Sequence, residues 1–79
     1  MNDDIYKKVK DIVVNVFEIE ENEIDYKTEF KSLDISSLMV LDVITDLERE
    51  FKVRVSNNDI QKLISIEGIV KYIEEKKVS

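Results

Sequence analysis

The chain has 79 residues, with no Cys, no His, no Pro and a single Gly, and its 18 acidic against 12 basic side chains give a formal net charge of −6 at pH 7. Without His or Cys the sequence lacks the usual general base, the thiolate nucleophile and the commonest metal ligands, which excludes a catalytic triad and a zinc–thiolate site. The acidic balance argues against nucleic acid and anionic membrane surfaces as partners, because both attract basic proteins.

A chain of this length predicts one domain, residues 1–79, that needs an efficient core to be stable. No apolar run is long enough to cross a membrane, and the N-terminal segment does not fit a signal peptide. We therefore expect a cytoplasmic monomer. A domain this small offers no obvious cleft in which the pKa of a carboxyl group would be raised for catalysis.

Residues 3–17 are predicted to form the first helix, because apolar side chains recur there with the spacing of one helical face. Asp3 and Asp4 stand in its first turn, where the helix dipole favours carboxylates. Val and Ile are weak helix formers, so packing against the rest of the domain must hold this helix. The apolar face consists of Ile5, Val9, Ile12, Val13, Val16 and Phe17.

Residues 18–35 show no sustained period and are predicted to be a long loop with one short turn. Loops of this length are uncommon in compact domains and often carry function. The acidic side chains of the loop lack the calcium-loop pattern of carboxylates around a central Gly, so a solvated charged loop is favoured over a cation site. The expected anchors to the core are Ile19, Ile24, Phe30 and Leu33.

Residues 37–51 are predicted to form the second helix. Its expected core face consists of Leu38, Leu41, Ile44 (or Val43), Leu47 and Phe51. Asp42, Asp46 and Glu50 follow each other at i, i+4 and i+8, which places them in one stripe opposite the core face. Residues 51–56 then alternate like a strand, but no second segment could pair with them, so a strand is rejected.

Two further helices are predicted near the C-terminus. Ser56 is expected to cap a short helix, with Asp59 three residues later in an arrangement close to a capping box. Ser65 is expected to cap the last helix, whose apolar set is Ile66, Ile69, Val70 and Ile73 and whose C-terminal end carries Lys76 and Lys77. The fold class is therefore all-α: a small four-helix bundle with three main helices, one short helix and a long first loop.

Two adjacent serines stand where the second helix begins, in the stretch "SLDISSLMVL". Ser36 can serve as the N-cap, with Ser37 as a tolerated first-turn residue. A phosphate ester on a serine here is the alternative, because the free N–H groups and the dipole of a helix N-terminus stabilise such a group. Local features alone favour the capping role.

The chain resembles the acyl carrier protein family, in which an Asp-Ser-Leu motif opens the second helix and the serine carries a 4′-phosphopantetheine arm. In "SSLMVLDVITDLEREF", Leu38 follows the serine, Asp42 and Glu48 match acidic positions of the family, and Phe51 closes the helix. The stretches "VRVSNNDIQKL" and "SIEGIVKYI" resemble the third and fourth helices of the family. "VKDIVVNVFEIEENEI" and "TEF" resemble its first helix and loop, so the likeness covers nearly the whole chain.

The resemblance implies that Ser37 is the attachment site for 4′-phosphopantetheine, because Ser37 keeps the register to the later motif residues. Ser36 then takes the N-cap role and is the less favoured attachment site. The chain departs from the family pattern at two positions: Ser36 replaces the Asp before the modified serine, and Asp34 replaces the Gly often found two residues before that Asp.

The implied function is to carry acyl intermediates as thioesters, for fatty acid or specialised acyl/polyketide-type biosynthesis, without catalysis by the chain itself. The arm supplies the thiol that the sequence lacks and tethers the acyl group near whichever enzyme binds the carrier. Two alternatives stay open: an unmodified helical adaptor that binds proteins, and a peptidyl or amino-acyl carrier.

The partners implied by the resemblance are a phosphopantetheinyl transferase and acyl-handling enzymes with basic docking patches. The ladder of like charges on the second helix costs about a few tenths of a kcal/mol per pair, which fits a docking role. The alternative is a solvated face on which Arg49 offsets the repulsion. The expected docking residues are Asp42, Asp46, Glu48, Glu50, Leu38 and Met39.

Overall fold

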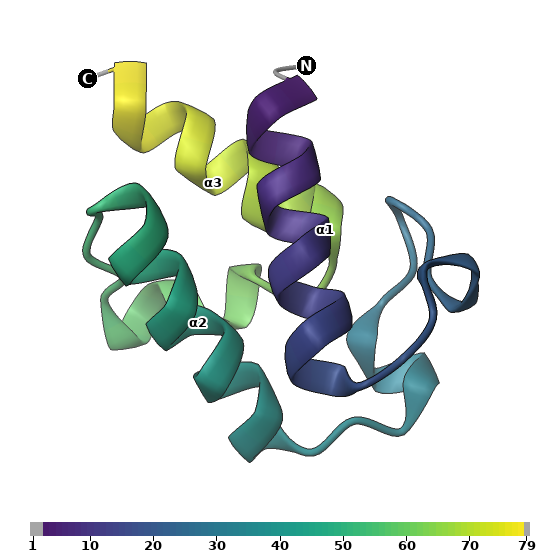
Figure 1. Cartoon of the computed structure of the whole chain (residues 1–79). Coiled ribbons are helices and arrows are strands. Elements are labelled where there is room, and N and C mark those ends of the chain that lie inside the picture. Colours follow the sequence, from purple (N-terminus) through teal and green to yellow (C-terminus); the bar gives the residue numbers. More distant parts are fainter. Residues whose placement is uncertain (1–2, 79) are drawn as a thin grey trace.

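Three α-helices make up the body of the molecule (Figure 1). The computed structural model of the chain describes residues 3–78, with α1 at Asp3–Phe17, α2 at Ser37–Phe51 and α3 at Ile66–Val78. The three predicted main helices are confirmed. Residues 3–78 contain no strand, and the segment 53–56, where a strand was rejected, has no regular secondary structure.

Short 3₁₀ helices occupy the connections: η1 at Glu21–Glu23, η2 at Phe30–Leu33 and η3 at Asn57–Lys62. The predicted fourth helix is η3, which confirms the all-α bundle of three main helices and one short one. The expectation of one turn in the first loop was wrong, because η1 and η2 are both present. Ser56 occupies the N-cap position of η3 as predicted, but its side chain makes no capping hydrogen bond there.

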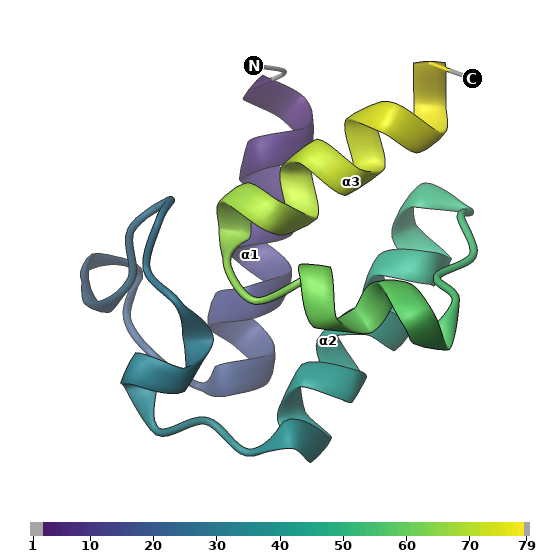
Figure 2. The ribbon, with the colours of Figure 1, turned by 180° about the vertical axis from the view of Figure 1, so that it is seen from behind.

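The core lies between the three helices, and α1 packs against both of the others. Figures 1 and 2 show η3 in the connection between the C-terminal end of α2 and the start of α3. The predicted apolar face of α1 is confirmed, with Ile12 and Val16 half-buried at its edges. The fully inward positions are Ile5, Val9, Val13 and Phe17 of α1, Val43, Ile44, Leu47 and Phe51 of α2, and Ile66, Ile69, Val70, Tyr72 and Ile73 of α3.

The first loop is anchored to this core as expected. Ile24 and Phe30 are buried, and Ile19 and Leu33 are half-buried. The ring of Phe30 packs edge-to-face against Phe17, with 5.1 Å between ring centroids, an arrangement that stabilises aromatic pairs beyond their burial. Two backbone hydrogen bonds join the loop to the chain around the start of α3: Phe30 N–H to Ile64 O at 2.8 Å and Glu67 N–H to Tyr26 O at 2.9 Å.

The expected core face of α2 was wrong for two residues. The side chain of Leu38 is 74% exposed and that of Leu41 is 44% exposed. Apolar side chains cover more than half of the circumference of this helix, and α1 packs on the part centred on Val43 and Leu47. Leu38 and Leu41 lie on the remaining apolar part, toward solvent.

The last helix begins as predicted. The Ser65 Oγ accepts a hydrogen bond from Gly68 N–H at 3.1 Å, which satisfies one of the free donors of the first turn of α3. Lys76 and Lys77 lie in the last turn, where the helix dipole favours cations. The ammonium of Lys77 also lies 5.8 Å from the ring centroid of Phe51, at the end of α2.

Candidate functional site

The two serines at the start of α2 have different structural roles. Ser36 is the N-cap, with extended backbone angles, and its Oγ accepts a hydrogen bond from Met39 N–H at 3.4 Å. Ser37 is the first residue of α2 and is exposed. No group within residues 3–78 makes a hydrogen bond to its hydroxyl. The capping prediction for Ser36 is therefore confirmed, and the Ser37 hydroxyl is left accessible.

The turn before the serines is left-handed at Asp34. This residue ends η2 with φ 59° and ψ 40°, and its N–H donates to Lys31 O at 3.3 Å. Gly adopts such angles at no steric cost, and Asp tolerates them better than most other residues. The backbone thus explains why a Gly suits this position and why the replacement by Asp34 is compatible with the same turn.

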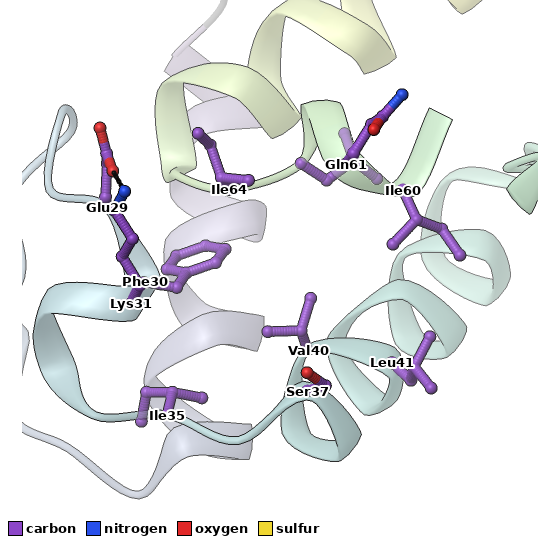
Figure 3. Close-up of a pocket in the computed structure, with 11 residues that line it drawn as sticks. Glu29, Phe30, Lys31, Ile35, Ser37, Val40, Leu41, Ile60, Gln61 and Ile64 are labelled. Carbon is purple, nitrogen blue, oxygen red and sulfur yellow. Dashed lines mark ion pairs between the residues drawn. The ribbon is translucent and has the colours of Figure 1, made fainter. Parts of the chain in front are cut away.

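A pocket of about 400 Å³ opens beside Ser37 (Figure 3). The sequence did not predict this pocket. Figure 3 shows Val40 and Leu41 on α2, with Ile64 on the segment before α3, around the same hollow. The remaining lining residues are Glu29, Phe30, Lys31, Ile35, Ile60, Gln61 and Leu63. Most of this surface is apolar, which suits a hydrocarbon group.

Polar side chains lie at the edge of the pocket. Lys31 Nζ lies 3.2 Å from Glu29 Oε1, and this pair is solvent-exposed. The Gln61 Nε2 donates to Asn58 O at 3.3 Å. These three side chains pair with each other or with the backbone at the edge, and most of the pocket wall consists of carbon atoms.

The four acidic side chains of α2 differ in what they contact. Asp42 is exposed, and Asp46 is half-buried in a shallow hollow with Ile12 of α1 and Arg49. Glu48 Oε2 accepts a hydrogen bond from Val55 N–H at 3.0 Å. Glu50 Oε2 lies 3.5 Å from Lys8 Nζ of α1.

The two apolar candidates of the same helix also differ, because Leu38 is exposed and Met39 is half-buried. Sequence reasoning did not single out Ile35, Ile60 or Ile64 as site residues. Their signal is that they are apolar but lie outside the three main helices: Ile35 is in the loop before α2, Ile60 in η3 and Ile64 in the segment before α3. Such residues need a tertiary partner, and here they share the pocket wall.

Within residues 3–78, no group of three or more acidic side chains is placed to hold a metal ion. In the same part of the chain, no helix is long and apolar enough to cross a membrane.

Comparison with known proteins decides the family. The profile of the phosphopantetheine attachment site family matches residues 7–73. An acyl carrier protein of Lactococcus lactis subsp. cremoris is 36% identical over 73 residues, which are 92% of this chain and 97% of the relative. The chain belongs to the acyl carrier protein family. Acyl carrier proteins of Petrotoga mobilis and Thermotoga maritima are 31% and 32% identical over 75 residues, which are 94% of this chain and 88% and 93% of those relatives.

The family is that of carriers with a covalent 4′-phosphopantetheine group, not of catalysts. When bound, this group supplies a thiol for thioester formation. The residues at the start of α2 fit it. The helix N-terminus offers backbone N–H groups and the positive end of the dipole to a phosphodiester, and Ser37 offers an exposed hydroxyl. The arm would start at the rim of the apolar pocket.

Proposed function

We propose that this acyl carrier bears its arm on the Ser37 Oγ. The proposal rests on one observation, that the hydroxyl groups of the two serines have different structural roles. Ser36 uses its hydroxyl as the N-cap of α2, whereas the Ser37 hydroxyl is exposed at the rim of the pocket. In the loading reaction, the Ser37 hydroxyl loses its proton to the transferase, its oxygen bonds to the phosphorus of the phosphopantetheine part of coenzyme A, and adenosine bisphosphate leaves.

The pocket supports an acyl group as the cargo. Its walls are formed by Val40, Ile60, Leu63 and Ile64 among others, so methylene groups inside it would be removed from water. Each buried methylene is worth about 0.8 kcal/mol. Chains in fatty acid synthesis, or in a specialised acyl or polyketide-type pathway, have this chemistry. A peptidyl or amino-acyl cargo would bring polar groups against the same apolar walls.

We propose as partners a phosphopantetheinyl transferase and acyl-handling enzymes whose surfaces are basic. The net charge of −6 favours encounters with such surfaces. The exposed carboxylate of Asp42 and the exposed side chain of Leu38 near Ser37 are available to them. The monomeric state and the cytoplasmic location expected from the sequence stay predictions.

The attachment site is tested by intact mass after co-expression with a broad-range phosphopantetheinyl transferase. The wild-type chain and Ser36→Ala should gain the mass of the arm, and Ser37→Ala should not. Loss of labelling in Ser36→Ala with full labelling in Ser37→Ala would place the arm on Ser36 instead. A wild-type chain that gains no mass, with a known carrier labelled in parallel, would favour the unmodified adaptor.

A further inference from the structure

The two main walls of the pocket are held in place by different amounts of buried surface. One wall belongs to α2, which has four buried core residues, and Figure 3 shows Ile60 and Ile64 across the hollow from Val40 of this helix. No residue of η3 is fully buried. Burial therefore fixes α2 more firmly than η3, so the contacts that η3 makes with its neighbours decide the width of the pocket. The residues of this second wall are Ile60 and Gln61 of η3, followed by Leu63 and Ile64.

Contacts with α3 position η3. The Tyr72 hydroxyl of α3 donates a 2.8 Å hydrogen bond to Asp59 Oδ2, on the residue before Ile60. At the end of η3, a Cβ added at Gly68 of α3 would lie 2.5 Å from the Lys62 carbonyl oxygen, so the two backbones are in close contact there. The Tyr72–Asp59 hydrogen bond is the side-chain contact that can be removed without changing this backbone packing.

The hydroxyl of Tyr72 has a role separate from that of its ring. The side chain is only 8% exposed, so its ring is part of the core, and Phe would fill the same space. A hydroxyl group in such a place is costly unless it makes a hydrogen bond. The group reaches the half-buried Asp59, whose other carboxylate oxygen lies 3.4 Å from Lys62 Nζ. The hydroxyl thus serves to hold η3 against α3.

We infer that the Tyr72–Asp59 hydrogen bond determines which acyl chains the carrier can hold, because it fixes the position of η3 opposite α2. The inference rests on the proposed function, since it concerns the acyl group of an arm on Ser37. A chain that fits the pocket leaves the bond intact. A longer or branched chain has to displace η3, and breaking the bond then opposes the burial of its further methylene groups. Tyr72 and Asp59 are positioning residues in this role.

The strength of the bond sets the size of the effect. A hydrogen bond to a carboxylate that water partly reaches lies at the lower end of the range for charged groups, which equals the burial of about two methylene groups. Removing the Tyr72 hydroxyl should therefore let the carrier bury about two more carbon atoms. If α2 moved outward instead of η3, the variant would hold the same chains as the wild type.

The first measurement is made on the chain without an arm. Leu63 N–H donates to Ile60 O at 2.9 Å, and Leu63 is 1% exposed, so hydrogen exchange at this amide reports the opening of η3. The amide should exchange about tenfold faster in Tyr72→Phe and in Asp59→Ala than in the wild type. The double variant should match the single ones, because either change already removes the bond. Asp59→Asn keeps an acceptor oxygen and should stay near the wild type.

The second measurement uses the loaded carrier. A broad-range phosphopantetheinyl transferase loads the chain from a series of acyl-coenzyme A substrates, butanoyl to hexadecanoyl, and hydroxylamine then cleaves each thioester. In the wild type the cleavage rate should fall with chain length until the pocket is full and then level off. In Tyr72→Phe this plateau should begin about two carbon atoms later. Tyr6→Phe removes the hydroxyl of a half-buried tyrosine of α1 outside the pocket, and it should match the wild type.

The outcomes separate the inference from the proposed function. An unchanged exchange rate of the Leu63 amide in Tyr72→Phe would show that the bond does not hold η3. A plateau at the same chain length in both proteins would overturn the inference and leave the carrier proposal standing, and so would a wild-type rate that falls all the way to hexadecanoyl. Faster cleavage of every chain with an unmoved plateau would indicate a destabilised fold and no control of length. A wild-type chain that is never loaded, beside a known carrier that is, removes the proposed function itself.

Discussion

The hydroxyl of Tyr72 donates a 2.8 Å hydrogen bond to Asp59 Oδ2 and thereby joins α3 to η3. Lys62 Nζ lies 3.4 Å from the other carboxylate oxygen of Asp59. Burial, together with this carboxylate, raises the pKa of Tyr72 to about 12. The Tyr72 hydroxyl in turn holds the pKa of the Asp59 carboxyl below its ordinary value of 3.8. Because η3 supplies Ile60 and Gln61 to the pocket, this hydrogen bond also fixes one of its walls.

The first prediction follows from the raised pKa of Tyr72. Its neutral form is favoured in the folded state, so its contribution to stability is complete below its ordinary pKa of 10.0 and is lost as the pH rises toward 12. Urea melts of the wild type should therefore show a falling free energy of unfolding over this window. Tyr72→Phe should show a smaller fall, and the difference between the two proteins isolates the contribution of the Tyr72 hydroxyl.

The same pair predicts a dependence on acid pH of opposite sign. The contribution of Asp59 is present above its ordinary pKa of 3.8 and is lost as the pH falls through the lower value of the folded state. Removing the donor in Tyr72→Phe should make the loss of stability in acid shallower. If the free energy of unfolding fell equally with acid pH in the two proteins, the hydrogen bond would not contribute to the titration of Asp59.

Gly68→Ala should destabilise the fold, although Ala is the better helix former by about 1 kcal/mol. A Cβ added at Gly68 would lie 2.5 Å from the Lys62 carbonyl oxygen, a backbone atom that cannot move without shifting the end of η3. Overpacking of this kind costs about 1–3 kcal/mol, so we expect a net loss of about 1 kcal/mol. Chemical denaturation measures it, and Lys71→Ala on an exposed position of the same helix is the control.

Replacements of Ser36 separate its capping role from modification. Ser36→Ala should lower stability by about 0.5–1 kcal/mol, because the hydrogen bond from Met39 N–H is lost. Ser36→Asp should keep the cap, place a carboxylate at the positive end of the helix dipole and speed modification by a broad-range transferase. Thermal melts and the initial rate of mass gain measure the two effects. A rate unchanged by Ser36→Asp would indicate that the acidic residue of the family motif is dispensable here.

The sequence was sufficient for the existence and the ends of the main helices. Ser36 and Ser65 cap α2 and α3 as expected, because a cap depends only on a hydroxyl and the N–H groups two or three residues later. The orientation of α2 was not predictable in the same way. Its apolar residues offer overlapping stripes, and only the position of α1 selects Val43 and Leu47 over Leu38 for burial.

Other features of the site depend on contacts between distant segments. Tyr72 and Asp59 are 13 residues apart, and nothing in the spacing indicates that they meet. The pocket likewise needs η3, the first loop and α2 to come together, so the sequence alone does not show that Ile60 and Ile64 share its wall. The left-handed turn at Asp34 is a local feature. The family often has Gly at this position, and this preference indicates a left-handed turn although this chain has Asp there.

The last prediction concerns Glu48, which the family resemblance marks as a docking residue and which the structure shows bonded to the main chain. Its Oε2 accepts the half-buried Val55 N–H at 3.0 Å and so ties the connection after α2 back to the helix. Glu48→Ala would leave this donor without its acceptor, at a cost of about 1–3 kcal/mol. Glu48→Gln keeps an acceptor oxygen and should cost less.

Hydrogen exchange at the Val55 amide distinguishes this role from docking. The amide should exchange faster in Glu48→Ala than in the wild type, and Glu48→Gln should fall between them, because a neutral amide oxygen is a weaker acceptor than a carboxylate. Neither variant should alter the salt dependence of transferase binding, since the Glu48 carboxylate is held against the chain by the Val55 N–H. If the Val55 amide of Glu48→Ala exchanged at the wild-type rate and the salt dependence of binding were lowered, Glu48 would belong to the docking surface after all.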